Sequence, residues 1–456
     1  MESLSHTICA ISTPAGTGGI AVVRVSGDEA FDCVQKCWNG APIAGMKSHT
    51  AHLGKILFEN GETLDEVVLT IFRAPHSFTG ENVAEIACHG SVWVQQQIVH
   101  RLVDCGCRIA APGEFTRRAF SKGRIDLSQA EAIADVIAAN SRAAHRIAMS
   151  QMRGDFSRTL SQLREKLLNF VALMELELDF SEEEVEFADR AKLIALAENI
   201  SGVVARLASS FSTGNAIKNG VPVAIVGETN VGKSSLLNTL LHDDKALVSN
   251  VHGTTRDVIE DTITIEGQLF RFIDTAGIRE TTDTVESMGI ERTFHKLSQA
   301  AIVLWVIDAT QNSDEISKTY AKISALCSDK KLICVANKCD LINSPTPLQL
   351  PCSNVVQISA KTGIGIETLQ REILASSQIP EADENQVIVT NARHYQALTA
   401  ALAALQRALA ALRTNLSGDL ISQDIREAIH YLGEITGEIT PSDILTTIFS
   451  HFCIGK

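Results

Sequence analysis

The chain has 456 residues and a formal net charge of −14 at pH 7. This length exceeds what one hydrophobic core usually serves and favours about three domains of ~150 residues each. The net negative charge argues against indiscriminate nucleic-acid binding, and therefore against DNA as a ligand, because affinity for phosphates depends on clustered Lys and Arg. A local basic patch remains open.

Eleven cysteines are scattered along the chain without a C-x-x-C pair, and no apolar leader follows the first residue. This pattern predicts reduced thiols rather than a disulfide framework. The longest uninterrupted apolar run, at 300–307, is far too short to span a membrane. We therefore expect a soluble, cytoplasmic protein that makes no use of a membrane.

Residues 1–120 carry short β-branched runs, at 20–25 and 67–72, that are interrupted by Gly and Pro. This pattern predicts a small α/β domain. From residue 127 onward, Ala and Leu recur at helical spacing, so helices are expected over 121–215.

The same helical pattern resumes at 397–412 and 420–432, after a polar linker. The two helical blocks, 121–215 and 379–456, are expected to form one discontinuous bundle, with a domain at 216–378 inserted between them. An insertion requires its two ends to lie close together, as they commonly do in doubly wound domains.

The inserted region begins with a phosphate-binding motif, which runs from Gly227 to Ser234 and matches G-x-x-x-x-G-K-[ST]. The motif follows an apolar run at 221–226 and precedes a helical segment that begins at Lys233. Backbone N–H groups and the helix N-terminus would cradle phosphates, and Lys233 would reach the β and γ oxygens. The Ser234 hydroxyl is left for Mg²⁺. The sequence therefore predicts a nucleoside triphosphate site.

Asn337, Lys338 and Asp340 belong to an Asn-Lys-Cys-Asp motif at the end of another apolar run. One carboxylate there can accept both the N1–H and the N2 amino group of guanine, and adenine offers no such pair of donors. A site built around that carboxylate rejects adenine, because an unpaired buried polar group is costly. We expect GTP rather than ATP.

Two further motifs complete the order expected of a Ras-like P-loop GTPase domain. Ser359-Ala360-Lys361 resembles the loop whose backbone N–H meets guanine O6, and Asp274-Thr275-Ala276-Gly277 ends a strand where an Asp linked to Mg²⁺ is expected. Asn337 and Asp340 could instead be ordinary turn residues. Four motifs in order at strand ends favour the GTPase interpretation.

Ile278 follows Gly277 at the position where many GTPases place a Gln that orients the attacking water. Because Ile cannot hydrogen-bond, another group must hold the water, and Arg279 and Glu286 are candidates. Glu286 could equally be a surface charge. No arginine finger is evident, but Asn230 could offer its amide oxygen to a monovalent cation that would stabilise the transition state.

Motifs along the whole chain are similar to those of the MnmE (TrmE) family of tRNA modification GTPases, within the TrmE-Era-EngA-like group. They are Gly253-Thr-Thr-Arg-Asp257, Asp274 to Gly277 followed by an apolar residue, the inserted GTPase domain, the terminal Phe452-Cys-Ile-Gly-Lys456, and in the N-terminal region Thr13-Pro14, Gly18-Gly19, Arg24, Thr79-Gly80-Glu81, His89-Gly90, Pro112-Gly-Glu-Phe115 and 126–131.

The resemblance implies an N-terminal domain of folate-binding type that forms a homodimer, and a flavoprotein partner, MnmG, in a heterotetramer. It also implies a reaction. The two proteins would add a carboxymethylaminomethyl or aminomethyl group to carbon 5 of the wobble uridine of certain tRNAs. The one-carbon donor would be 5-formyl- or 5,10-methylene-tetrahydrofolate.

Site residues carried over from the family fall into several sets. Mg²⁺ would be held by Ser234 and Thr255, and water would be positioned by Glu286. The K⁺ of a K⁺-stimulated GTPase would be held by Asn230 and by backbone atoms of Ser249, Val251 and Thr254. The GTP-binding positions are Asn230, Val231, Gly232, Lys233, Ser234, Ser235, Ser249, Asn250, Val251, His252, Gly253, Thr254, Thr255, Asp274, Thr275, Ala276, Gly277, Asn337, Lys338, Asp340, Ser359, Ala360 and Lys361.

The family's folate-binding positions match Arg24, Glu85, Arg124 and Lys456. The two arginines could neutralise a glutamate tail and Glu85 could accept donors from a pterin. Isolated charged residues are mostly solvated, so this assignment rests on the resemblance. Two departures keep the relevant chemistry: Thr229 stands where Pro is frequent, and Arg124 stands where some members have Lys.

Cys453, near the chain end, is a candidate catalytic thiol, and a buried structural cysteine remains an alternative. The last four residues superficially fit a prenylation box, but a final Lys and the lack of a polybasic stretch disfavour it. A rival function is a ribosome-assembly or regulatory GTPase switch without modification chemistry. Such a switch would be expected to carry a basic RNA-binding module in place of the folate-type domain.

Overall fold

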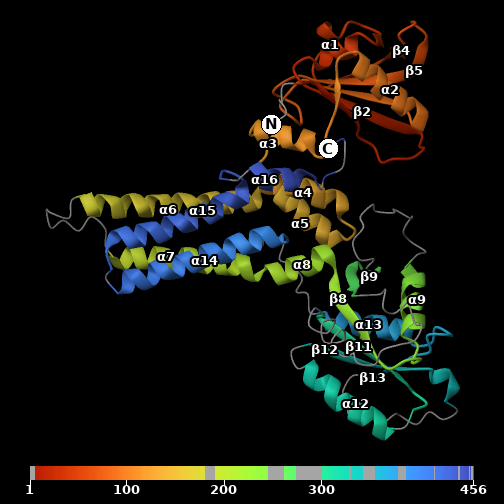
Figure 1. Cartoon of the computed structure of the whole chain (residues 1–456), viewed down its shortest axis with the longest axis vertical. Helices are drawn as coiled ribbons and strands as arrows, with labels where there is room; N and C mark the ends of the chain where they lie inside the picture. The colour runs from red at the N-terminus through yellow and green to blue at the C-terminus, as the bar shows by residue number, and fades with distance from the viewer. Residues whose placement is uncertain are drawn as a thin grey trace. The chain divides into compact units, whose positions relative to one another are not determined.

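Figure 1 shows a computed structural model of the chain, which describes residues 6–179, 190–244, 261–273, 300–311, 313–327, 330–342, 355–377, 387–414, 416–439, 442–450, 452 and 455. The chain forms two compact units. The first comprises Met1–Ile137, Ala148–Glu198 and Ala403–Lys456, and the second comprises Ala138–Ile147 and Asn199–Leu402.

The first unit begins with a seven-stranded sheet in the order β3-β4-β5-β6-β2-β1-β7. Only the β1–β7 pair is parallel. The strands are β1 (Ile8–Ile11), β2 (Ile20–Ser26), β3 (Trp38–Asn39), β4 (Thr50–Leu57), β5 (Thr63–Phe72), β6 (Val83–His89) and β7 (Arg108–Ile109).

Alternating side chains give this sheet one core face. In β5, Val67, Leu69 and Ile71 are buried while the residues between them are not, as the period of two of a strand requires. Helices α1 (Ala30–Gln35) and α2 (Val92–Asp104) cover that face and close the core. A 3₁₀ turn at Ile43–Gly45 and helix α3 (Glu114–Ser121) complete this part. The expected α/β domain is confirmed.

Helices make up the rest of the first unit and the start and end of the second. They are α4 (Leu127–Ala138), α5 (Arg142–Met152), α6 (Asp155–Asp179), α7 (Arg190–Ser209), α8 (Phe211–Asn219), α14 (Ala392–Arg413), α15 (Gly418–Thr436) and α16 (Ser442–Ser450).

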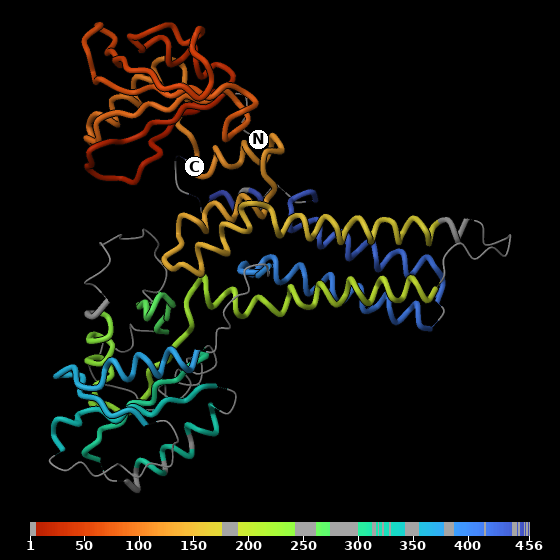
Figure 2. Tube along the Cα trace, turned by 180° about the vertical axis from the view of Figure 1, so that it is seen from behind, coloured from red at the N-terminus to blue at the C-terminus, as the bar shows by residue number. Residues whose placement is uncertain are grey.

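The early and late helices pack together, as Figure 2 shows for the yellow and blue segments. Helix α6 packs along α15. Arg190 of α7 donates to the Leu412 carbonyl at 3.2 Å, and Arg413 pairs with Glu198 at 2.6 Å. The discontinuous helical bundle expected from the two Ala- and Leu-rich blocks is therefore confirmed.

One helical stretch of the described residues, Arg190–Asn219, is long and apolar enough to cross a membrane by length and composition. A core helix passes the same test. The buried positions of α7 recur on one face, at Leu193, Ala197, Ile200 and Val204, as in an amphipathic bundle helix. The stretch is weak evidence for a membrane span.

The second unit contains a six-stranded sheet in the order β13-β12-β11-β8-β10-β9, in which only β9 is antiparallel to its neighbour. The strands are β8 (Val221–Val226), β9 (Asp261–Ile265), β10 (Gln268–Phe272), β11 (Ile302–Asp308), β12 (Lys331–Asn337) and β13 (Val355–Gln357). Three helices pack against this sheet: α9 (Lys233–Asp244), α12 (Ser313–Leu326) and α13 (Ile366–Ser376).

Both faces of this sheet are covered, because α9 and α13 contribute to one apolar cluster and α12 to the other. Strands buried on both faces read as continuous apolar runs, as β8 and β11 do. In such doubly wound folds, ligands bind outside the carboxyl ends of the parallel strands. The described GTP motifs, at 227–234, 337–340 and 359–361, follow the ends of β8, β12 and β13, so this edge positions the candidate site.

Candidate nucleotide site

The phosphate loop joins the end of β8 to the start of α9. Two of its positions require glycine because a side chain there would clash with neighbouring atoms. A Cβ on Gly232, whose φ is +97°, would lie 2.2 Å from Asn337 Nδ2, and a Cβ on Gly227 would lie 2.3 Å from the Val306 carbonyl oxygen. Asn230 is exposed and adopts a left-handed backbone with φ 62°. Glycine at these two positions lets the loop pass this close to Asn337 and Val306.

Lys233 begins α9 and folds back over the loop. Its ammonium donates to the carbonyl oxygens of Gly227 at 2.8 Å and Glu228 at 2.6 Å. Ser234 is half-buried in the first turn of α9, and Ser235 is exposed beside it. A helix N-terminus with a lysine and a hydroxyl is a site for phosphate and for a hard cation.

Asn337, the last residue of β12, joins two loops. Its side chain is only 3% exposed. The amide nitrogen donates to the Val231 carbonyl at 2.8 Å, and the amide oxygen accepts the Ala360 N–H at 2.9 Å. Thr239 of α9 also donates to the Ala360 carbonyl, at 2.9 Å. One carboxamide therefore fixes the phosphate loop relative to the Ser359–Lys361 loop.

Lys338 follows in a left-handed conformation, with φ 67°, and turns the chain into the short 3₁₀ helix Cys339–Leu341. The Cys339 N–H donates to the Ile358 carbonyl at 3.1 Å. Asp340 is exposed on this turn, and Ser359 is buried in the neighbouring loop. The turn therefore presents a carboxylate next to the loop predicted to meet guanine O6.

The structure brings together the predicted GTP positions that it describes, at the carboxyl edge of one sheet. These are Asn230, Val231, Gly232, Lys233, Ser234, Ser235, Asn337, Lys338, Asp340, Ser359, Ala360 and Lys361. The other predicted positions lie outside the described residues, and their roles stay predictions: Ser249, Asn250, Val251, His252, Gly253, Thr254, Thr255, Asp274, Thr275, Ala276, Gly277, Glu286, Cys453 and Lys456.

Arg24 and Glu85, predicted to bind folate, are partners across β2 and β6. Arg24 donates to Glu85 Oε1 through Nε at 2.9 Å and through Nη2 at 2.8 Å. The guanidinium lies 5.7 Å from the Phe78 ring centroid and 5.6 Å from that of Phe115. The stem of the exposed Arg124 lies against Gly80, so the three described folate positions lie around one loop.

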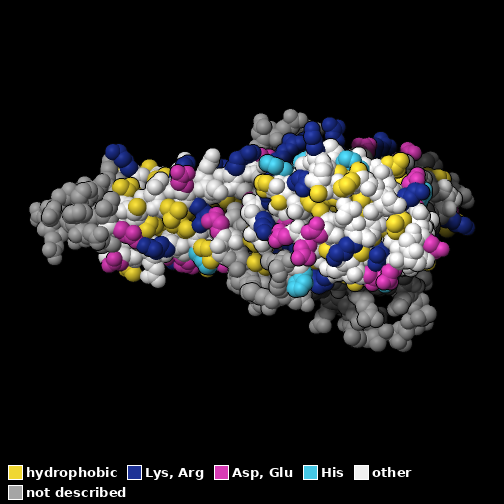
Figure 3. Space-filling view, turned by 90° about the horizontal axis from the view of Figure 1, so that it is seen from above, with side chains coloured by type: hydrophobic (Ala, Val, Ile, Leu, Met, Phe, Trp, Pro, Cys, Tyr) yellow, Lys and Arg dark blue, Asp and Glu magenta, His cyan; other side chains and the backbone are white. Residues whose placement is uncertain are grey.

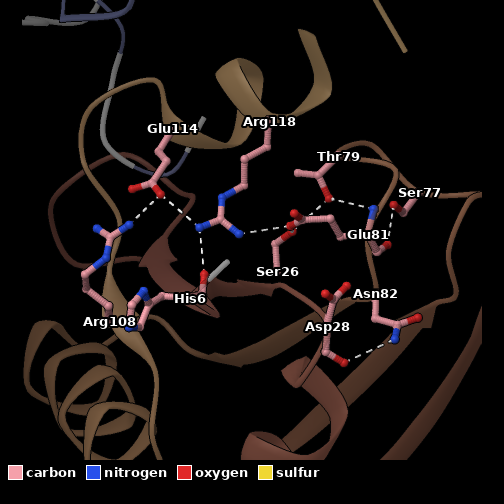
Figure 4. Close-up of polar contacts among 10 residues, drawn as sticks. All are labelled: His6, Ser26, Asp28, Ser77, Thr79, Glu81, Asn82, Arg108, Glu114 and Arg118. Carbon is pink, nitrogen blue, oxygen red and sulfur yellow. Dashed lines mark hydrogen bonds and ion pairs between the residues drawn. The ribbon is translucent and has the colours of Figure 1, made fainter. Parts of the chain in front are cut away.

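A buried ionic network lies in the same N-terminal part of the chain (Figure 4). Arg118, 1% exposed, donates to Glu81 at 3.1 Å, to Glu114 at 2.9 Å and to the His6 carbonyl at 2.7 Å. Arg108 adds a second cation on Glu114, at 2.6 Å. The network joins α3 to the loop before β6, and it explains why the Thr-Gly-Glu and Pro-Gly-Glu-Phe motifs carry acids. Residue patterns alone did not indicate this pairing.

Asp308 is a second feature that the sequence did not single out. It ends β11 beside Asn337 and pairs with Lys338, with Oδ2 and Nζ 2.6 Å apart. Its place directly after the apolar run 302–307 is the same signal that marked Asn337, so that signal could have found it.

A phosphate loop on a doubly wound sheet, with an Asn-Lys-x-Asp turn held against it, defines a P-loop GTPase domain. The profile of the MnmE helical domain family matches residues 127–453, and that of the GTP-binding protein TrmE N-terminus matches residues 7–124. The first profile covers more than half of the chain.

Relatives named tRNA modification GTPase MnmE align over nearly the full length. The chain is 54% identical to the protein of Parabacteroides distasonis, over 99% of this chain and 100% of that one. It is 54% identical to that of Bacteroides fragilis and 49% identical to that of Flavobacterium johnsoniae, over 99% of each chain in both cases. The chain belongs to the MnmE family of tRNA modification GTPases.

Proposed function

We propose that the chain is a K⁺-stimulated GTP hydrolase that acts with a flavoprotein of the MnmG type on tRNA. The pair adds a carboxymethylaminomethyl or aminomethyl group to carbon 5 of the wobble uridine. One observation carries the GTPase part: the Asn337 carboxamide holds the phosphate loop against the Ser359–Lys361 loop. The assignment of tRNA as the substrate rests on the name of a relative that is 54% identical over 99% of this chain.

The residues of the site have separate roles in GTP binding and hydrolysis. The loop N–H groups and Lys233 bind the phosphates, and the Asp340 carboxylate accepts hydrogen bonds from guanine. Phosphoryl transfer needs little covalent chemistry from the protein, so catalysis depends on positioning and on electrostatic stabilisation. Glu286 holds the attacking water in this proposal.

Mg²⁺ and K⁺ fit the donors that the sequence offers. The Ser234 hydroxyl, in the first turn of α9, and Thr255 would hold Mg²⁺. Asn230, exposed and left-handed in the loop, would hold K⁺ with the backbone of Ser249, Val251 and Thr254. Both ions would supply positive charge beside the transferred phosphoryl group.

A one-carbon tetrahydrofolate would bind at Arg24, Glu85, Arg124 and Lys456. The Arg24 and Glu85 side chains are 20% and 27% exposed, so a ligand can reach both. A guanidinium beside a carboxylate suits a ligand that carries both acidic groups and ring N–H donors. The ring centroids of Phe78 and Phe115 lie 5.7 Å and 5.6 Å from the Arg24 guanidinium, and the two rings limit its movement.

A homodimer is supported by the sheet face that helices α1 and α2 leave uncovered. Leu53 and Val68 are partners across β4 and β5 and are 70% and 39% exposed. Ile20, on β2, is also exposed. Large apolar side chains grouped on one open sheet face are typical of protein–protein contacts.

The surface charge and the cysteines fit a protein that acts on tRNA in the cytoplasm. Lys and Arg side chains lie among Asp and Glu side chains on the face in Figure 3, with several gathered along one margin. Local basic groups are therefore available despite the net charge of −14. Described cysteines are free thiols, as expected in a reducing compartment.

Reconstitution tests this function. The purified chain, an MnmG-type flavoprotein, GTP, K⁺, a one-carbon tetrahydrofolate and unmodified tRNA should yield a nucleoside with added mass at the wobble uridine. Omission of the chain or of GTP should abolish the product. The rival function, a switch without modification chemistry, predicts GTP hydrolysis with unchanged tRNA.

A further inference from the structure

Asp308 is held by hydrogen bonds on both carboxylate oxygens. Oδ2 accepts the Lys338 ammonium at 2.6 Å. Oδ1 accepts the N–H of Thr310 at 2.9 Å and its hydroxyl at 2.7 Å. The side chain is 14% exposed, and that of Lys338 is 33% exposed. A charge-assisted hydrogen bond of this length, partly shielded from water, is among the stronger polar contacts in a protein.

We propose that Asp308 is a positioning residue for guanine: by holding Lys338, it fixes the turn that presents Asp340 to the base. The inference rests on the proposed binding of GTP. It assigns a role in base selectivity to a residue outside all of the GTP motifs.

The backbone of Lys338 is the reason that this turn needs a tether. Its φ of 67° is left-handed, a conformation that is strained for a residue with a side chain and persists only where surrounding contacts enforce it. The backbone is held from one direction by the Cys339 N–H, which donates to Ile358. The side chain is held from the other direction by Asp308.

The ends of the two strands are already locked together. Asp308 and Asn337 are register partners in β11 and β12, and the Ala309 N–H donates to the Asn337 carbonyl at 2.9 Å. Asp308 is therefore a fixed point from which Lys338, the residue that follows β12, can be held. Movement of Lys338 would carry Asp340, two residues on.

Asp308 is charged at neutral pH. Partial burial alone would raise the pKa of this carboxyl, but hydrogen bonds from Lys338 and Thr310 outweigh it and hold the pKa below its usual value. The ion pair with Lys338 is therefore intact where the GTPase works.

The guanine contact is sensitive to such a tether. One carboxylate must accept N1–H and the N2 amino group at the same time, and a small displacement breaks the pair of bonds. Inosine diphosphate lacks the N2 amino group. The ratio of the affinities for guanosine and inosine diphosphates therefore reports how well Asp340 is placed.

The test is Asp308→Asn in the full chain, with binding of both diphosphates measured by calorimetry. Asn keeps an acceptor for Thr310 and nearly the same shape, and it removes the charge that holds Lys338. Affinity for guanosine diphosphate should fall about tenfold, the scale of one lost hydrogen bond to a charged group, and affinity for inosine diphosphate should fall less. Turnover at saturating GTP should change little.

Two further variants separate positioning from folding. Asp308→Glu keeps the charge but shifts it by one methylene, so its affinity ratio should lie between those of the wild type and the Asn variant. Gln311→Ala removes the contact that the same turn makes with Glu228, at 3.1 Å, and should keep the wild-type ratio. If the Asn variant does not fold, the affinity ratio of the Glu variant still tests the inference.

Equal losses for the two diphosphates, or an unchanged ratio in both Asp308 variants, would overturn the inference in favour of a purely structural contact. Failure of the wild-type chain to prefer guanosine over adenosine diphosphate would instead refute the proposed GTP site. The two failures are therefore distinguishable.

Discussion

Asn230 combines an exposed amide with a left-handed backbone inside the phosphate loop. Such a side chain is free to offer its oxygen to a cation beside the phosphates. We predict that K⁺ accelerates GTP hydrolysis and that Na⁺ is a poor substitute, because the positive charge stabilises the transition state. Turnover should be measured in matched K⁺ and Na⁺ buffers. The K⁺ response should disappear in Asn230→Ala, and a variant that keeps it would exclude this role.

Glu286 is predicted to position water, since Ile278 cannot. Glu286→Ala should lower turnover by about 10²–10⁴-fold, the usual contribution of a positioned acid or base. GTP affinity should stay nearly unchanged, because the group acts mainly in the transition state. Single-turnover hydrolysis and nucleotide titration on one preparation separate the two. Parallel loss of affinity would make Glu286 a structural residue.

Cys453 belongs to the terminal motif and to none of the nucleotide motifs. Cys453→Ser should leave GTP hydrolysis intact and strongly reduce wobble modification, because Ser nearly preserves volume but ionises far less readily than a thiol. Both activities should be assayed on the same purified variant with the flavoprotein partner. Full modification by the Ser form would exclude thiol chemistry, and loss of both activities would indicate a folding defect.

At the scale of elements, α3 is anchored to the N-terminal sheet by the Glu81–Arg118–Glu114 network. Burial alone would raise the pKa of Glu114. Hydrogen bonds from Arg108, the Ala111 N–H and Arg118 outweigh burial and hold the pKa below its usual value of 4.5. A depressed folded pKa means that Glu114 contributes stability above pH ~4.5, which is lost as the pH falls through the folded pKa.

We predict that Glu114→Gln destabilises the chain by about 3–5 kcal/mol at neutral pH, since it leaves the buried Arg118 without one counter-charge. The variant should also lose less stability than the wild type as the pH falls below about 4.5. Thermal unfolding at several pH values measures both effects. Glu59→Gln, at an exposed position, is the matched control and should follow the wild type. Identical pH profiles for the wild type and Glu114→Gln would contradict the assignment.

Local patterns predicted several strands of the two sheets and the helical character of the bundle, but strands β1, β4, β6 and β9 were not named. The apolar run at 221–226 coincides with β8, and the helical pattern at 397–412 lies within α14. The two-residue strands β3 and β7 were not expected, because so short a run has no periodicity to detect. Their pairing depends on the rest of the sheet.

The candidate site also contains residues that local patterns predict and contacts that they do not. Loops with strict steric or hydrogen-bonding needs, such as the phosphate loop and the turn at Asn337, have sequence signatures that residue patterns reveal. Contacts such as Arg118 with Glu81, 37 residues apart in sequence, depend on strand register, which no local pattern encodes. The Asp308–Lys338 pairing, 30 residues apart, likewise depends on the register of β11 and β12, although the apolar run before Asp308 marks the position of that residue.

At the scale of the whole molecule, the chain combines a GTPase domain, a helical bundle and an N-terminal α/β domain. The proposal that GTP hydrolysis serves tRNA modification links the first of these to the last. In this view the nucleotide site and the Arg24–Glu85 site have separate chemistry. Variants of either site should therefore impair wobble modification, whereas only variants of the nucleotide site should impair GTP turnover.

The most direct test is mass spectrometry of wobble uridines in tRNA from cells that lack this chain. The modified nucleoside should be absent, should return with the wild-type chain, and should stay absent with Lys233→Ala, which removes the ammonium expected to reach the nucleotide phosphates. Undiminished wobble modification in the cells that lack the chain would contradict the proposed function.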